Sequence, residues 1–232
     1  MPDARVTNSL RDSRVRAALD RLHGEARKDW RRFAGVIPGV LLGMLRGRPF
    51  GESLTPKAAR RIYMPVSREQ GQLLYLVART IGARRIVEFG TSFGISTIYL
   101  ASAVRDNGGE IMIGSELEPS KHQQAVANVK EAGLEHVTDI RLGDALETLR
   151  SVPEPLDLVL LDGWKDLYLP VLELLKPRLR RGAVVLGDNI FTFRRSLRPY
   201  VEYMQSGENG FESTTLSVSD GFEYSVYVGG PH

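Results

Sequence analysis

Residues 86–94 read Ile-Val-Glu-Phe-Gly-Thr-Ser-Phe-Gly, a short apolar run that contains one acidic residue and leads into two glycines. Because the run is almost wholly apolar, it predicts a strand that is covered on both faces, as in a parallel sheet. A helical pattern over residues 95–104 follows at once, so the stretch predicts the strand, glycine turn and helix of a βαβ unit. Ligands of such sheets bind beyond the carboxyl ends of the strands, where Gly90 and Gly94 lie.

The alternation of apolar runs with helical patterns continues along most of the chain and predicts a doubly wound, mostly parallel sheet of the α/β class. Residues 211–218 and 222–228 instead alternate in polarity around Ser219-Asp220-Gly221, which predicts a C-terminal antiparallel hairpin and seven strands in all. The expected strands before the hairpin are residues 85–89, 110–115, 137–142, 156–161 and 183–187, and the expected helices are residues 10–33, 67–81, 95–104, 120–132, 145–149 and 169–179.

A helical extension precedes this alternating body. We expect residues 1–62 to form the extension or cap, and residues 63–232 to form the domain that carries the site. Residues 1–61 hold 14 Lys and Arg against 6 Asp and Glu, whereas the rest of the chain is net acidic. The basic residues alternate with apolar ones as on the solvated face of an amphipathic helix, and no aromatic-interleaved basic groove accompanies them. Nucleic acid is therefore an unlikely partner.

Composition excludes several other classes. The chain has no cysteine, which rules out disulfides, thiolate zinc sites and cysteine nucleophiles. The apolar stretch at residues 33–45 is too short and too broken by glycine and proline to span a bilayer, and no signal-peptide pattern is present, so we expect a cytoplasmic protein without membrane partners. Within it, the segment 36–45 is interrupted by Pro38 and Gly39, and we expect it to cover an acceptor pocket or to pack against a second subunit.

The acidic residue inside the first strand favours one kind of nucleotide cofactor. A dinucleotide fingerprint has the pattern G-x-G-x-x-G, whose backbone approaches a pyrophosphate, and Glu88 would repel that group. A carboxylate attracts the cationic amino-acid portion of S-adenosylmethionine, which has no pyrophosphate. Glu116, at the end of the second strand, stands where a ribose-binding carboxylate belongs. The expected cofactor residues at these strand ends are Glu88, Gly90, Ser92, Gly94, Glu116, Leu117, Asp144, Ala145 and Asp162.

Three oxygen donors follow two later strands. Asp162 ends the run Leu-Asp-Leu-Val-Leu-Leu, and Asp188 and Asn189 end the run Ala-Val-Val-Leu-Gly. Magnesium and calcium prefer such oxygen ligands, and magnesium keeps open positions for water or substrate oxygens. Lys165 lies three residues after the first donor, and a nearby cation would lower its pKa toward that of a usable base. The alternative is that the two aspartates only cap turns, as Asp often does.

Residues 64–228 resemble the cation-dependent class I O-methyltransferases, specifically the catechol O-methyltransferase type. The likeness is carried by Met64-Pro-Val66, by the E-x-G-x-x-x-G-x-S loop from Glu88 to Ser96, by Glu116, by Asp162-Gly-Trp-Lys-Asp-Leu-Tyr-Leu-Pro170, and by Asp188-Asn189. The resemblance implies a Rossmann-like class I methyltransferase fold. It implies that Met64, Val66, Ser96 and Trp164 contact the cofactor.

The same resemblance assigns the chemistry. It implies that Asp162, Asp188 and Asn189 bind Mg²⁺ or another divalent cation, and that Lys165 is the catalytic base beside Asp162. The expected reaction is methylation of a phenolic or ortho-dihydroxy oxygen of a small molecule by S-adenosylmethionine, and bacterial members of the family suggest a homodimer. Three departures concern the acceptor. Gly163 replaces a histidine, and the residues after Asn189 read Ile-Phe-Thr-Phe-Arg in place of the family's proline- and glycine-containing loop that walls the catechol pocket. The family's late glutamate falls on Thr214, with Glu212 nearby.

Three other functions stay open at this level. A metal-independent small-molecule methyltransferase of the same fold would use Asp162 and Asp188 only structurally. A nucleic-acid methyltransferase would use the basic extension, although the sequence Asp-Asn-Ile-Phe lacks the Pro-Pro-aromatic string of base-amine methylation. A non-catalytic protein would bind the cofactor without turnover.

Overall fold

The computed structural model describes the backbone of residues 8–33 and 66–230, and the side chains of residues 8–26 and 66–230. Met64 and the apolar segment 36–45 lie outside the described residues. The division of the chain at residue 62 therefore remains a prediction.

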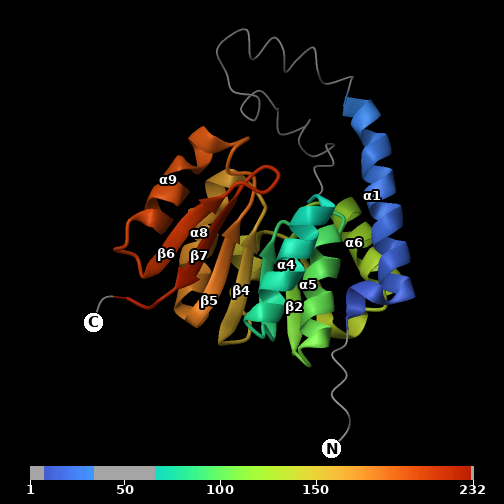
Figure 1. Cartoon of the computed structure of the whole chain (residues 1–232), viewed down its shortest axis with the longest axis horizontal. Helices are drawn as coiled ribbons and strands as arrows, with labels where there is room; N and C mark the ends of the chain where they lie inside the picture. The colour runs from blue at the N-terminus through green and yellow to red at the C-terminus, as the bar shows by residue number, and fades with distance from the viewer. Residues whose placement is uncertain (1–7, 34–65, 231–232) are drawn as a thin grey trace, which may run out of the picture.

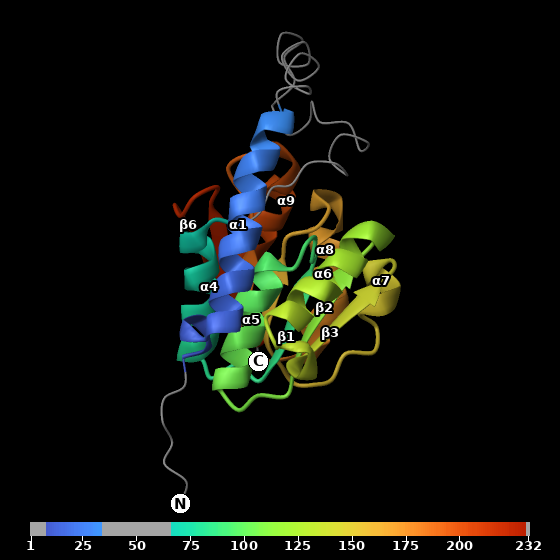
Figure 2. The same ribbon diagram turned by 90° about the vertical axis from the view of Figure 1, so that its right-hand side faces the viewer.

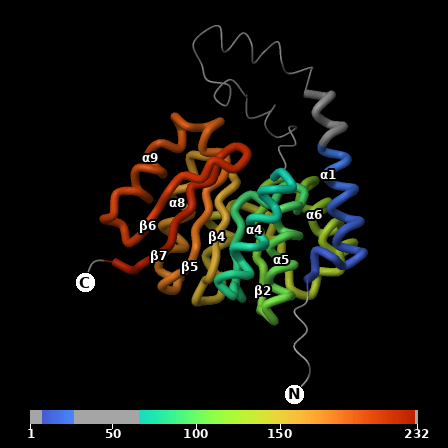
Figure 3. Tube along the Cα trace, in the orientation of Figure 1, coloured from blue at the N-terminus to red at the C-terminus, as the bar shows by residue number. Residues whose placement is uncertain are grey.

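Seven strands form one sheet in the order β3-β2-β1-β4-β5-β7-β6. Strands β1 to β5 pair in parallel, and β7 pairs antiparallel with β5 and β6, which confirms the predicted architecture. Figure 3 traces the chain as it leaves β5, passes through α9 and returns in the hairpin beside β5. The strands are β1 (Arg85–Phe89), β2 (Ile111–Glu116), β3 (Thr138–Leu142), β4 (Leu156–Leu161), β5 (Leu179–Gly187), β6 (Phe211–Leu216) and β7 (Phe222–Tyr227).

Helices cover both faces of the sheet (Figure 1). One face carries α4, α5 and α6, with α1 packed outside α5 and α6 (Figure 2), and the other face carries α7, α8 and α9. The helices are α1 (Ser13–Phe33), α4 (Arg68–Thr80), α5 (Ile95–Asp106), α6 (Pro119–Glu131), α7 (Ala145–Thr148), α8 (Tyr168–Leu175) and α9 (Arg194–Gln205), with a 3-10 turn, η4 (Lys165–Leu167), before α8.

Neighbouring residues of each central strand supply the two separate cores. Val159 of β4 points into the core beneath α8 and α9, and Leu158 and Leu160 point into the core beneath α4 and α5. All six residues of β4 are buried. Because successive side chains of a strand face opposite sides of a sheet, a strand covered on both faces is mostly apolar. The exception in β4 is Asp157, whose carboxylate accepts from the backbone N–H groups of Arg84 and Arg85 and from the Arg180 side chain. The continuous apolar runs of the sequence are thus a direct consequence of the three-layer arrangement.

The capping box that the sequence predicts at the start of α4 is present. The Ser67 hydroxyl accepts from the Gln70 backbone N–H at 3.1 Å, and the Gln70 side chain accepts from the Ser67 N–H at 2.9 Å. These two bonds satisfy amide groups that the first turn of a helix would leave unpaired. They also fix the position of the Gln70 side chain, which reaches the candidate site.

Two details differ from the sequence prediction. The helix expected over residues 169–179 ends at Leu175, because Pro177 shapes a 3-10 turn and β5 already begins at Leu179. Helix α9 is absent from the prediction, which assigns no element between residues 187 and 211; Pro199 lies within this helix. The buried residues Leu197, Tyr200 and Met204 nevertheless recur at helical spacing, which is the signal that identifies this helix.

Helix α1 shares the core of the sheet. Its residues Val15, Ala18, Leu19 and Leu22 are buried in the same cluster as α4 and α5. The opposite stripe is charged, as the amphipathic pattern predicts. None of the helices that the structure describes is long and apolar enough to cross a bilayer.

Candidate active site

Three adjacent strand ends are held together beyond the sheet. The Asp162 backbone N–H donates to the Phe89 carbonyl at 2.8 Å, and the Asp188 N–H donates to the Leu161 carbonyl at 3.0 Å. The hydrogen-bond ladder therefore continues past β1, β4 and β5. Gly90 permits this arrangement, because a Cβ at that residue would lie 2.6 Å from the Asp162 backbone and its φ is +99°. Glycine is the residue type that accepts both conditions.

Asp188 and Asn189 are positioned by their own backbone and by α4. Asn189 has a φ of 63°, in the left-handed region that asparagine tolerates better than most residues. Its N–H donates to Asp188 Oδ1 at 2.6 Å, and Gln70 Nε2 donates to the same oxygen at 2.9 Å. One carboxylate oxygen of Asp188 is therefore engaged, and Oδ2 is left for another partner.

Lys165 sits between the two strand ends. Its Nζ donates to Asn189 Oδ1 at 2.7 Å and to the Tyr168 hydroxyl at 2.8 Å, and it lies 3.6 Å from Asp162 Oδ1. The Tyr168 hydroxyl donates in turn to the Asp188 carbonyl at 3.1 Å. The Tyr168 and Phe193 rings also approach the amine, at 4.9 Å and 5.3 Å from their centroids. The structure thus brings Asp162, Lys165 and Asn189 together, as the sequence predicts.

The electrostatics of this cluster are unbalanced. Burial raises the pKa of Asp162 to about 6, with Lys165 opposing the rise and Asp220 adding to it. Burial and the charge of Asp162 raise the pKa of Asp188 well above its usual range. Burial lowers the pKa of Lys165, against the attraction of both aspartates. Two largely buried carboxylates therefore share one lysine whose own charged form is disfavoured.

This donor set fits a divalent cation. Among residues 8–26 and 66–230, no group of three His, Cys, Asp or Glu side chains converges. The candidate set consists of two carboxylates, Asp162 and Asp188, and the amide oxygen of Asn189. Oxygen donors of this kind suit a hard cation that keeps some positions for water or substrate. A divalent charge would also favour the ionised form of both aspartates, whose pKa values burial raises.

Glu88 is fully buried at the end of β1. Its Oε2 accepts from the hydroxyls of Thr91 at 3.2 Å and Thr97 at 2.5 Å, whereas Oε1 has no hydrogen-bond partner among the described residues. Burial raises the pKa of Glu88 to about 7, and the nearby hydroxyls of Ser96 and Thr97 offset that rise only in part. An unpaired buried carboxylate oxygen is costly, so an ammonium group or another donor would bind there favourably.

Glu116 joins the turns that follow β1 and β2. Its Oε2 accepts from the Ser92 N–H at 2.7 Å, and its Oε1 accepts from the Glu118 N–H at 2.8 Å. Ser92 has a φ of 50°, so the glycine loop turns sharply toward this carboxylate. Each carboxylate oxygen keeps a second lone pair that can accept from a ribose hydroxyl.

Comparison with known proteins places this arrangement in a family. Residues 87–190 match the family model described as a methyltransferase domain. The O-methyltransferase TomG of Streptomyces achromogenes, solved in complex with SAM, is 31% identical with a TM-score of 0.64 over 72% of this chain and 82% of that chain. An O-methyltransferase of Bacillus cereus, solved in complex with SAH, is 28% identical with a TM-score of 0.66 over 74% of this chain and 86% of that chain. The chain belongs to the class I O-methyltransferases.

Curated relatives of this methyltransferase carry a narrower description. A catechol O-methyltransferase of Mycobacterium tuberculosis is 35% identical over 134 residues, which cover 57% of this chain and 60% of that protein. A catechol O-methyltransferase of Niastella koreensis is 33% identical over 129 residues and 58% of its own length. The chain therefore spans about three fifths of the length of these curated relatives.

The remaining predicted cofactor residues of the methyltransferase line the same edge in different ways. Gly94 caps α5 with a φ of 84°, and Ser96 is buried in its first turn. Leu117 is 53% exposed and Trp164 is 45% exposed, so both apolar side chains are available to a ligand. Val66 instead points into the core beside α4.

The end of β3 contributes less than its sequence suggests. Asp144 caps α7, where its carboxylate accepts from the Leu146 N–H at 2.8 Å, and Ala145 is buried behind it. Asp144 is exposed, so one carboxylate oxygen stays available. The structure thus gives this residue the turn-capping role that the sequence allows for Asp at strand ends.

Phe89 accounts for one departure from the family pattern. A Cβ at Gly163 would overlap the Phe89 ring, so a larger residue in the position where the resemblance expects histidine would require that ring to move. Another departure concerns the late glutamate. Thr214 and Glu212 are both exposed on β6, whereas Asp220, at the hairpin turn, contributes to the raised pKa values of Asp162 and Asp188.

Sequence reasoning misses a chain of hydrogen bonds, here called the strut, that joins α1 to the glycine loop after β1. Arg21 Nη2 donates to Asn128 Oδ1 at 2.8 Å, and Asn128 Nδ2 donates to the Phe93 carbonyl at 2.9 Å. Phe93 lies in the glycine loop directly before Gly94. No local motif connects residue 21 with residue 128, so this contact appears only when α1 packs on α6.

The raised pKa of Glu88 predicts a stability change with pH. In the folded protein this pKa is about 7, above the ordinary value of 4.5, so Glu88 favours folding below pH 4.5 and that contribution is lost as pH rises to about 7. Glu88→Gln should therefore raise the free energy of unfolding of the ligand-free protein, relative to the parent, by about 1–3 kcal/mol more at pH 8 than at pH 5. Urea unfolding at the two pH values measures this difference. Exposed Glu212→Gln is the control. An equal effect of Glu88→Gln at both pH values would contradict the assignment.

The strut predicts a selective binding defect. Asn128→Ala removes the donor to the Phe93 carbonyl, and we expect S-adenosylmethionine to bind about three- to tenfold more weakly, with kcat little changed. Glu131→Gln is a matched control, because it weakens the Arg21 ion pair but leaves Asn128 in place. If calorimetry finds equal cofactor affinity in the parent and Asn128→Ala, the strut serves only stability.

Proposed function

We propose that the protein transfers a methyl group from S-adenosylmethionine to a phenolic or ortho-dihydroxy oxygen of a small molecule, with assistance from a divalent cation. The observation that carries this proposal is the arrangement of Lys165 between Asp162 and Asn189, at strand ends adjacent to the one that bears Glu88. Family membership supports the reaction class, and the catechol O-methyltransferases among its relatives support the acceptor class.

The donor would bind at the ends of β1 and β2. The unpaired Oε1 of Glu88 is suited to its ammonium group, and the lone pairs of Glu116 are suited to its ribose hydroxyls. The two carboxylates lie on neighbouring strands that pair residue by residue. Both ends of one extended ligand can therefore be held by rigid elements, which positions its methyl group for attack.

Lys165 is suited to accept the proton of the acceptor hydroxyl. Burial favours its neutral form, which has two N–H donors and one lone pair. Asn189 Oδ1 and the Tyr168 hydroxyl can accept both donors, which leaves the lone pair for the incoming hydroxyl. The acceptor oxygen then forms its bond to the methyl carbon as the carbon–sulfur bond breaks, the proton passes to Lys165 Nζ, and S-adenosylhomocysteine leaves.

Asp162, Asp188 and Asn189 would hold the cation. When bound, a divalent cation supplies Lewis acidity that lowers the pKa of a hydroxyl and helps to orient a diol. The side chains themselves prepare the position, because Gln70 and the Asn189 N–H fix one oxygen of Asp188 and leave the other free. Asp162 is held at the end of β4 by its backbone bond to Phe89.

One observation favours a metal-independent variant of the same reaction. Lys165 already lies 3.6 Å from Asp162 and donates to Asn189, so its ammonium form could neutralise part of the acidic cluster. In that case Lys165 would orient the acceptor and the phenol would ionise unaided. The two functions differ in their response to chelators.

Metal dependence is the decisive measurement. We expect methyl transfer to catechol to stop after chelator treatment and to return with Mg²⁺. Asp162→Ala and Asp188→Ala should abolish the Mg²⁺-stimulated rate while S-adenosylmethionine affinity stays within about threefold, because the cation organises the acceptor. Asp139→Ala, at an exposed ion pair on β3, is the control. Full activity after chelation would select the metal-independent reaction.

The role of Lys165 has its own signature. Lys165→Met keeps most of the buried stem but removes the proton acceptor, and we expect kcat to fall by about 10²–10⁴-fold. Cofactor binding should change little, and the rate should partly recover at high pH, where the acceptor ionises without a base. The exposed Lys130→Met serves as control. A parent-like rate for Lys165→Met at every pH would exclude Lys165 as the base.

A further inference from the structure

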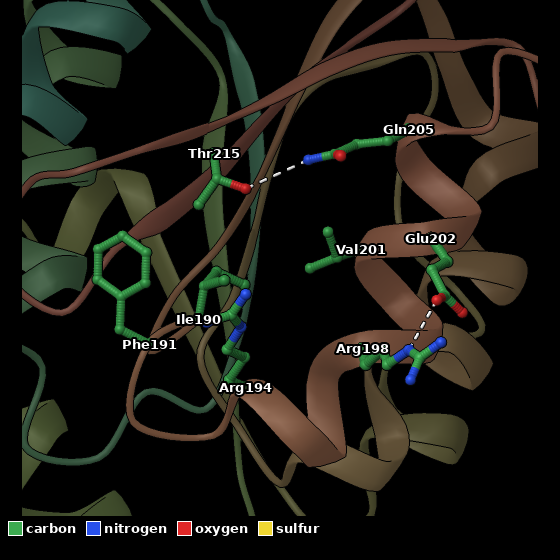
Figure 4. A pocket seen from close by; sticks show the side chains of 8 residues that line it. All are labelled: Ile190, Phe191, Arg194, Arg198, Val201, Glu202, Gln205 and Thr215. Carbon is green, nitrogen blue, oxygen red and sulfur yellow. Dashed lines mark hydrogen bonds and ion pairs between the residues drawn. The ribbon is translucent and has the colours of Figure 1, made fainter.

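A cavity of about 600 Å³ lies between α9 and the edge strand β6 (Figure 4). Its volume falls within the range of small-molecule pockets. It touches the loop that follows Asn189, and nothing in the proposed methyl transfer uses its polar groups. The residues that line it are Ile190, Phe191, Arg194, Arg198, Val201, Glu202, Gln205 and Thr215.

One wall of the cavity is apolar and rigid. Ile190 is buried, and the Phe191 ring is 47% exposed. That ring is nevertheless held in place, because it packs directly on the backbone of Gly221. A Cβ added at Gly221 would lie only 2.9 Å from the ring atoms. The Phe191 N–H also donates to the Asp220 carbonyl at 3.0 Å. A fixed, half-exposed phenyl group offers a flat surface on which an aromatic ring can stack.

Most polar groups of the cavity are already paired. Arg198 forms an ion pair with Glu202 at 2.7 Å, one turn along α9. Gln205 Nε2 donates to Glu223 at 2.8 Å and to Thr215 Oγ1 at 3.2 Å. Arg194 differs, because no hydrogen bond or ion pair joins its guanidinium group to the part of the chain that the structure describes. Its side chain and that of Ile190 line the same cavity (Figure 4).

We propose that this cavity binds an aromatic carboxylate, with the ring against Phe191 and the carboxylate on Arg194. The lining has a net charge of about +1, because the charges of Arg198 and Glu202 cancel and the charge of Arg194 is left. This net charge suits a ligand with a single negative charge. A planar guanidinium pairs with a carboxylate through two parallel hydrogen bonds. A phosphate dianion fits less well, because Glu202 would lie in the same lining.

The position of the cavity links it to the active site. Ile190 and Phe191 directly follow Asn189, and the Ile190 N–H bonds to the Gly221 carbonyl at 3.3 Å. An aromatic carboxylate at this wall could therefore be the acidic substituent of the acceptor itself, or a separate molecule that adjusts the loop bearing Asn189. The ligand chemistry is the same in both cases.

Binding is tested first without turnover, so that the outcome does not depend on the proposed reaction. The probe is 3-phenylpropanoate, titrated by calorimetry and by amide NMR shifts. We expect saturable binding with shifts in Phe191, Gln205 and Thr215. The neutral 3-phenylpropanamide and the ringless anion acetate should each bind at least about tenfold more weakly, because one lacks the charge and the other lacks the ring.

Variants then locate the probe. Arg194→Gln should weaken 3-phenylpropanoate about tenfold or more, and Arg194→Lys should weaken it less. The double variant Arg198→Gln/Glu202→Gln is the matched control within the same lining, since it removes a paired cation and anion and leaves the net charge of the lining unchanged. Val201→Trp should block the cavity while Arg194 stays intact, and thermal unfolding checks that each variant folds. The proposal is overturned if the probe does not saturate, if the amide binds equally well, or if Arg194→Gln and Val201→Trp leave its affinity unchanged.

Kinetics then distinguish the two sources of the carboxylate, provided that methyl transfer is observed. If the acceptor carries it, Arg194→Gln raises KM for 3,4-dihydroxyphenylpropanoate but not for catechol. If a separate molecule carries it, 3-phenylpropanoate changes the rate with catechol in the parent and not in Arg194→Gln. Both results support the cavity as a binding site. If methyl transfer is absent, the proposed function fails while the binding result stands.

Discussion

The close approach of the backbone at Gly90 to the backbone at Asp162 is the constraint on which the site depends. Strands β1 and β4 can continue their hydrogen bonding past the last apolar residue only because no Cβ stands between them. This contact sets the distance between Glu88, at the proposed donor end of the site, and Lys165, at the proposed acceptor end. A larger residue at position 90 would move these two parts of the candidate site apart.

The cost of that compactness is electrostatic. Glu88, Asp162 and Asp188 are drawn out of water, and each has a raised pKa as a result. Among the described residues, Lys165 forms an ion pair with Asp162 of this cluster. Burial lowers the pKa of Lys165, so its charged form is disfavoured too. The ionised form of these three carboxyl groups is unfavourable unless a positively charged ligand binds beside them. A cationic cofactor beside Glu88 and a divalent cation beside Asp162 would both supply that charge, so ligand binding and the relief of repulsion are the same event.

Support for the site comes from elements distant in sequence. Gln70 reaches Asp188 from α4, Asn128 reaches the glycine loop from α6, and Arg21 holds Asn128 from α1. The basic face of α1 therefore has a partner inside the protein, which explains part of its charge without nucleic acid. On the far side, Asp220 ties the hairpin to the loop after Asn189 through Thr192.

The layered sheet, the order of most elements and the residues at the strand ends follow from the sequence alone. They do so because strands covered on both faces are mostly apolar, and because side chains at the carboxyl ends of parallel strands meet at one edge. Helix α9, which contains Pro199, and the early end of α8 are missing from the sequence prediction. Folding alone establishes which polar groups support the site, since the contacts of Arg21, Gln70, Asn128 and Asp220 join segments that no local pattern relates. Folding also leaves the Arg194 guanidinium in a cavity without an ion-pair partner among the described residues, because that cavity is made by a loop, a helix and an edge strand that are distant in sequence.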